Sequence, residues 1–141
     1  MPSFSLYTAV FMSFAVSALM MLVLFYLKHL NVNRQATSAW AIAFACICAR
    51  FFCSLMIAAD YPMFAMGVDF FLLGFASFLW SGTALFNDDP DHSSQLMLWF
   101  ACLSMWIMVA HLTDVAFFWQ SLPVHLAAGA VVVAVAYRFW Q

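Results

Sequence analysis

Charged residues are scarce in this sequence. Only 7% of the 141 residues are charged; four are basic, and the six acidic residues are all aspartate. A water-soluble globular domain carries about a quarter charged residues, so this composition excludes one. No basic run is present, which excludes a nucleic-acid partner, and no polybasic cluster marks the chain as a binder of anionic lipid.

Several sequence motifs are also missing. None of the four cysteines forms a C-x-x-C pair and all lie in apolar segments, which favours buried small side chains over disulfides. The chain has no nucleophile elbow, phosphate-binding loop or HExxH motif, so we expect no enzymatic activity from it. The N-terminus lacks a basic region and a cleavage site, which predicts that Met1 to Leu30 is a retained first span rather than a signal peptide.

Apolar residues make up 68% of the chain, including seventeen phenylalanines and six tryptophans. This composition predicts an all-α integral membrane bundle, and the polar clusters divide it into five spans. We expect the spans at about residues 6–27, 38–58, 63–86, 95–117 and 124–140, within a single domain covering 1–141. Trp119 to Pro123 is expected to form the turn between the last two spans.

The basic residues indicate the orientation of the bundle. Lys28 and Arg34 lie in the first loop, and Arg138 lies at the end of the fifth span. Basic residues favour the cytoplasmic side, so we expect the C-terminus inside and the N-terminus outside. The last residues continue a helical pattern without a polar tail, which suggests that the fifth helix leads into a cytoplasmic output domain.

Two charged residues lie inside neighbouring spans at similar depth. Arg50 is about ten residues before the turn at Asp60, and Asp69 is about eight residues after this turn. Charged groups in a bilayer are costly and by default mark a functional site or a paired contact. Because arginine stays charged, we expect an Arg50–Asp69 ion pair between the second and third helices.

The fourth and fifth spans place further ionisable groups at this depth. His111 and Asp114 share one helical face before the last turn, and His125 follows this turn. Three interpretations stay open. The groups satisfy one another and specify helix packing, or they line an outward-facing pocket for a ligand, together with Arg50 and Asp69. Alternatively, His111 and His125 ligate the iron of haem b or another metal ion.

Two sequence spacings bear on helix packing. Cys46, Arg50 and Cys53 share one helical face, which would bring both thiols near the proposed pocket. Small residues recur four positions apart, a spacing that allows close helix contact in membranes. The two pairs are Ser77 with Ser81, and Ala130 with Ala134.

The order of features resembles the multispan N-terminal sensory modules of bacterial diguanylate cyclases (GGDEF proteins) and some histidine kinases. In those modules a basic loop is followed by a tryptophan, matched here by Thr37-Ser38-Ala39-Trp40-Ala41, and by a third span rich in Gly and Trp. Val68 to Gly74 and Leu79 to Phe86 match this third span. Two positions depart from the pattern: Asp69 replaces an amide and Ala84 a basic residue.

The resemblance implies a sensory input domain in the bacterial inner membrane. It implies that ligand binding moves the fifth helix, which relays the change to a cytoplasmic output, and that the full-length protein is a homodimer. The alternative function is a small integral subunit of a redox complex, with haem held by His111 and His125. A third alternative is a purely structural or assembly subunit.

Overall fold

The computed structural model describes residues 3–88, 93–113 and 115–140, and in these ranges the chain forms helices and short turns without a strand. The prediction of an all-α protein is therefore confirmed. The long helices are α1 (Ser3–His29), α2 (Arg34–Ala58), α3 (Ala65–Phe86), α4 (Ser93–Leu112) and α5 (Phe117–Trp140), and a single 3₁₀ turn, η1 (Pro62–Phe64), precedes α3.

Four segments are long and apolar enough to cross a bilayer: Thr8–His29, Arg34–Ala58, Pro62–Phe86 and Phe118–Trp140. A stretch of about 20 apolar residues spans the hydrocarbon core. The apolar part of α4, Leu98–Leu112, is shorter. The helices are therefore those of a multi-pass membrane protein, with four or five spans.

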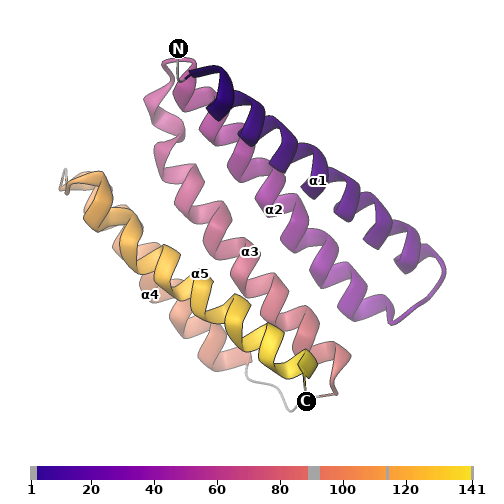
Figure 1. Cartoon of the computed structure of the whole chain (residues 1–141). Coiled ribbons are helices and arrows are strands. Elements are labelled where there is room, and N and C mark those ends of the chain that lie inside the picture. The colour runs from indigo at the N-terminus through magenta and orange to yellow at the C-terminus, as the bar shows by residue number, and fades with distance from the viewer. Residues whose placement is uncertain (1–2, 89–92, 114, 141) are drawn as a thin grey trace.

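The helices form an antiparallel bundle in which α3 is central (Figure 1). It packs against α2 on one side and against α4 and α5 on the other, while α1 contacts only α2 among the helices. The N-terminal and C-terminal ends lie at opposite ends of the bundle. Because α3 contacts three helices, any polar group on its buried faces can link distant parts of the sequence.

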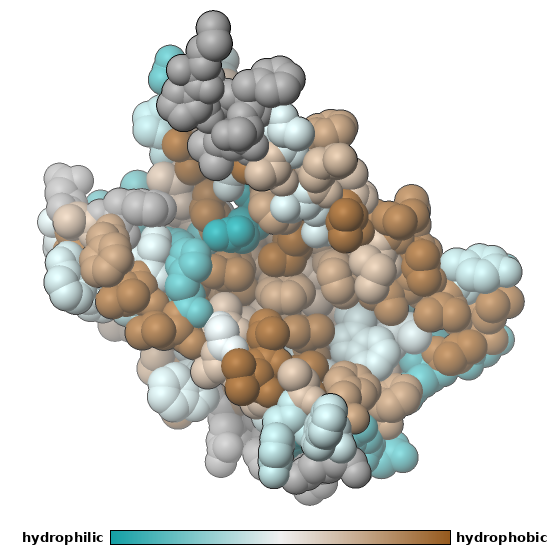
Figure 2. All heavy atoms as spheres, in the orientation of Figure 1, coloured by the Kyte–Doolittle hydropathy of each residue, from teal (hydrophilic) through white to brown (hydrophobic). Residues whose placement is uncertain are grey.

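Large apolar side chains cover the surface instead of filling the interior. Phe11, Leu19 and Leu22 on α1 are each about 60% exposed, whereas the buried positions of α2 are mostly alanine. Figure 2 shows hydrophobic residues over most of the visible face. In a bilayer the lipid chains solvate such side chains, and small residues allow helix backbones to approach closely.

Three glycines of α3 make that close approach to α2. A Cβ atom at Gly67 would lie 2.9 Å from the sulfur of Cys53, and one at Gly74 would lie 3.1 Å from the sulfur of Cys46. At Gly82 it would lie 2.5 Å from Nε1 of Trp40. Cys46 and Cys53 therefore pack on the glycine backbone of α3.

The turn between the last two helices lies earlier in the chain than expected. The predicted fourth span to residue 117 is too long, because α4 ends at Leu112. The predicted turn at Trp119–Pro123 is also wrong, because α5 begins at Phe117 and Pro123 lies inside it. Pro123 is the seventh residue of α5, so its missing N–H leaves the carbonyl of Trp119 without its usual helical partner, yet the helix continues past it.

Candidate functional site

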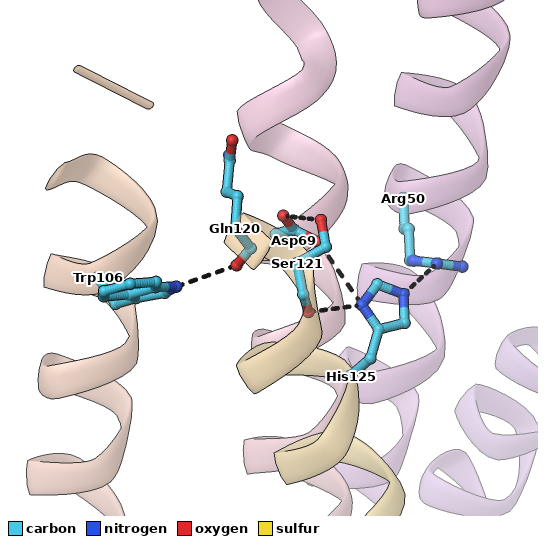
Figure 3. A network of polar contacts seen from close by, with 6 residues as sticks. All are labelled: Arg50, Asp69, Trp106, Gln120, Ser121 and His125. Carbon is cyan, nitrogen blue, oxygen red and sulfur yellow. Dashed lines mark hydrogen bonds and ion pairs between the residues drawn. The ribbon is translucent and has the colours of Figure 1, made fainter. Parts of the chain in front are cut away.

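Asp69 is a buried acid near the start of α3, the central helix of the bundle. It is the fifth residue of α3 and is 0% exposed. Its Oδ2 atom accepts a hydrogen bond of 2.7 Å from the hydroxyl of Ser121 on α5, and its Oδ1 atom has no hydrogen-bond partner among the described residues. One oxygen of this carboxyl is thus satisfied by the protein and the other is not (Figure 3).

Ser121 and His125 lie one turn apart on α5, and both face Asp69. His125 Nδ1 lies 2.9 Å from the backbone carbonyl of Ser121 and 3.9 Å from Asp69 Oδ1. This geometry requires an α5 that is helical before Pro123, since a turn at 119–123 would separate the two residues. Ser121 was not predicted as a site residue because it was expected in the turn; its four-residue spacing from His125 was the available signal.

Arg50 reaches the site from α2 through the histidine. Its Nη2 atom lies 3.3 Å from Nε2 of His125, and its Nε atom is buried without a partner. The predicted direct Arg50–Asp69 ion pair is not formed: in the described part of the chain, the ionisable side chain next to the Asp69 carboxyl is His125, with Nδ1 3.9 Å from Oδ1. The prediction of similar depth was sound, but it could not include the imidazole that lies between the two groups.

The contacts of His125 indicate which tautomer it holds. A backbone carbonyl can only accept, so Nδ1 must carry the proton that it donates to Ser121. Arginine can only donate, so Nε2 must be the unprotonated acceptor. A neutral imidazole with its proton on Nδ1 satisfies both contacts, whereas a doubly protonated ring would direct an N–H toward the guanidinium.

The four residues do not form a nucleophilic triad, although an acid, a serine and a histidine meet. The Ser121 hydroxyl donates to the carboxyl, and the histidine contacts the backbone carbonyl of the serine rather than its hydroxyl. A serine nucleophile needs its hydroxyl hydrogen-bonded to a base. The geometry instead suits binding of a small polar group and relay of a change in charge between helices.

A second polar contact joins α4 to this region. Trp106 donates its indole N–H to the backbone carbonyl of Gln120 at 3.0 Å, and the Gln120 side-chain nitrogen is buried without a partner in the described structure. Neither residue was singled out from the sequence. Gln120 directly precedes Ser121, so Trp106 fixes the start of α5 at the point where it enters the site (Figure 3).

The remaining predicted site residues are not brought into the network. His111 is exposed near the end of α4 and makes no hydrogen bond or ion pair with any other described residue, and Asp114 lies outside the described residues. The described side chains contain no cluster of three or more metal-ligating residues. Both ring nitrogens of His125 are engaged, so this arrangement does not fit an axial haem ligand.

No family model, curated protein or solved structure matches the chain. The resemblance to sensory modules of diguanylate cyclases and histidine kinases therefore stays a prediction. The site itself joins α2, α3 and α5.

Proposed function

We propose that this chain is a membrane-embedded sensory domain of a bacterial signalling protein, in which a small polar ligand binds at Asp69 and shifts α5 against α2 and α3. The observation that carries the proposal is the half-satisfied carboxyl: Asp69 is fully buried, is bonded to Ser121 through Oδ2, and has Oδ1 unpartnered beside His125. A buried acceptor without a donor is costly, so it favours a ligand that supplies one.

The network supports a switch because two of its contacts join different helices, which a ligand could move apart. Asp69 holds α5 through Ser121, and His125 holds α2 through Arg50. A ligand that donates to Asp69 and accepts from Arg50 would compete with these contacts. A ligand shifts the equilibrium between two helix arrangements only if it binds them with different affinity. Here the difference in affinity would come from the hydrogen bonds that the ligand makes in place of those between the helices.

The same proposal includes the topology. Lys28, Arg34 and Arg138 lie at the end of the bundle opposite the polar network, which supports a cytoplasmic location for that end and an outer-half location for the site. The bundle would then lie in the bacterial inner membrane with its N-terminus outside. The fifth helix carries the change inward, and the full-length protein acts as a homodimer.

The test joins the chain after Gln141 to a diguanylate cyclase catalytic domain and measures cyclic di-GMP with a fluorescent reporter in cells. The site variants are Asp69→Asn, Ser121→Ala and His125→Gln. The matched control is Leu126→Ala, next to His125 and 64% exposed. At equal protein abundance, we expect the site variants to change output by at least about fivefold, the lower range of coupling between sites.

Two results would overturn the proposal. Site variants that accumulate normally and give the parent output would assign the network to packing alone, as in a structural subunit. A Soret band in the purified chain that is lost in both His111→Ala and His125→Ala would assign it to a haem protein.

A further inference from the structure

A second feature of the bundle is an apolar cavity along the middle of α3, which begins at Leu73, one helical turn after Asp69, and extends to Trp80. It has a volume of about 410 Å³, which is within the usual range of ligand pockets. It lies between α3, α4 and α5. Its lining residues include Ala76, Ser77 and Trp80 of α3, Leu96, Trp99 and Leu103 of α4, and Ala127, Ala130 and Ala134 of α5.

The cavity exists because small side chains face one another across it. Ser77, Ala130 and Ala134 have the spacing expected of close helix contact, yet all three line this open volume. In membranes, empty space between helices loses van der Waals contact that lipid or another helix would provide. The small residues thus shape a chamber here instead of a tight interface.

The lining offers almost nothing to a polar ligand. Its one hydroxyl, on Ser77, donates to the backbone carbonyl of Leu73 at 2.9 Å, and no charged side chain lines the cavity. A polar group placed there would lose its hydrogen bonds to water without replacement. An alkyl chain fits this environment.

A cation lies at one end of the cavity. The guanidinium carbon of Arg138 is 4.3 Å from the ring centroid of Trp80, which lines the cavity, and Arg138 follows Ala134 by one helical turn. Arginine pairs well with phosphate oxygens, and basic sites between membrane helices bind anionic head groups. The sequence has no polybasic cluster, so selectivity rests on this single cation beside an apolar chamber.

We propose that the cavity binds one acyl chain of an anionic phospholipid, whose phosphate pairs with Arg138. The apolar lining favours the acyl chain of the lipid, and Arg138 at the end of the cavity favours an anionic head group. This inference needs only a membrane-embedded bundle and does not depend on the proposed sensory function.

The test is native mass spectrometry of the full chain released from detergent with defined lipids. Wild-type protein with palmitoyl-oleoyl phosphatidylglycerol is expected to retain one lipid per chain. Arg138→Gln should weaken this binding by about fivefold, the contribution of one basic residue near a membrane surface. Affinity for the zwitterionic phosphatidylcholine analogue should be lower in wild type, because its choline cation offsets the phosphate charge, and it should fall by less than that of phosphatidylglycerol in Arg138→Gln.

Variants that fill the cavity test whether it holds the acyl chain of the lipid. Ala130→Phe and, from the opposite helix, Ser77→Leu are expected to abolish retention of the lipid. Val133→Phe adds the same bulk on α5 at a position that is 69% exposed and outside the cavity, so it should retain the lipid. Circular dichroism of each variant identifies those that fold, and either filling variant suffices for the test.

Other occupants give distinct results that would overturn the proposal. Equal retention of both phospholipids by wild type would remove the role of charge. Displacement of the phospholipid by an equal concentration of oleate would indicate a free fatty acid. A lipid-free dimer that Ala130→Phe dissociates would indicate a second copy of the chain. Retention of the lipid by a folded filling variant would place it outside the cavity.

Discussion

Ser121 on α5 donates its hydroxyl proton to Oδ2 of Asp69 on α3 at 2.7 Å, and both side chains are buried. The two residues are 52 positions apart in the chain. This contact joins α3 to α5 beside the 3.9 Å contact of His125 Nδ1 with Asp69 Oδ1, and it places His125 between Asp69 and Arg50.

Removing the Ser121 hydroxyl should destabilise the protein, because it leaves Asp69 with no hydrogen bond from the described residues. We expect Ser121→Ala to cost about 1–3 kcal/mol of unfolding free energy, the range for an unsatisfied buried group. Denaturation in detergent, followed by circular dichroism, measures it. When Asp69 is already replaced by leucine, Ser121→Ala should lower the unfolding free energy by much less than it does in the wild type, which a double-mutant cycle measures.

The control for that cycle is Ser54→Ala. Among the described residues, the Ser54 hydroxyl bonds only to the backbone carbonyl of Arg50 within its own helix. Its loss should have a much smaller effect than Ser121→Ala. Equal costs for the two serines, or strict additivity of Ser121→Ala with Asp69→Leu, would mean that the bond between α3 and α5 contributes nothing.

Gly82→Ala should destabilise the bundle. The new Cβ would lie 2.5 Å from Nε1 of Trp40, whose ring also packs against Phe86 and Phe139. Overpacking of this kind costs about 1–3 kcal/mol. Gly129→Ala is the matched control, since nothing lies within 4 Å of its added Cβ, and it should be neutral or slightly stabilising.

The thermal midpoint of each variant in the same detergent measures this difference. Adding Trp40→Leu to Gly82→Ala should recover part of the loss, because the smaller side chain leaves room for the methyl group. An unchanged midpoint for Gly82→Ala, or equal losses for both glycines, would contradict the close approach of α2 and α3.

His125 should be neutral, with its proton on Nδ1. The backbone carbonyl of Ser121 requires a donor at Nδ1 and Arg50 requires an acceptor at Nε2. Solid-state ¹⁵N NMR of histidine-labelled protein in lipid distinguishes the two nitrogens, and His125→Gln assigns the signal by its loss. A doubly protonated ring, or a proton on Nε2, would contradict the Arg50 contact.

Trp106→Phe should loosen the start of α5. The substitution keeps the aromatic bulk but removes the 3.0 Å hydrogen bond to the Gln120 carbonyl, with an expected cost of about 1 kcal/mol. Hydrogen exchange of the segment around Gln120 should rise. Trp119→Phe is the control, because Trp119 is 62% exposed, and it should leave exchange unchanged.

Part of the site could be predicted because ionisable residues are so rare in this chain. With few charges available, Arg50, Asp69 and His125 had to be the polar groups of their spans, and helical rise placed them at similar depth. Ser121 could not be found in this way, since serine is common and its role depends on where α5 begins. The proline at 123 indicated a turn, although it lies inside α5 as the seventh residue of this helix.

The sequence alone determined that the protein is helical and embedded in a membrane. Its long apolar segments have the length of membrane-spanning helices, and it has too few polar residues to cover the surface of a water-soluble protein. Only the tertiary structure decided that His125 separates Arg50 from Asp69, and that Cys46 and Cys53 meet glycines rather than the polar site. It also decided that Ala130 and Ala134 line a cavity. Periodicity gives the face and depth of a residue, but its partner depends on how far each helix is rotated and shifted against its neighbours.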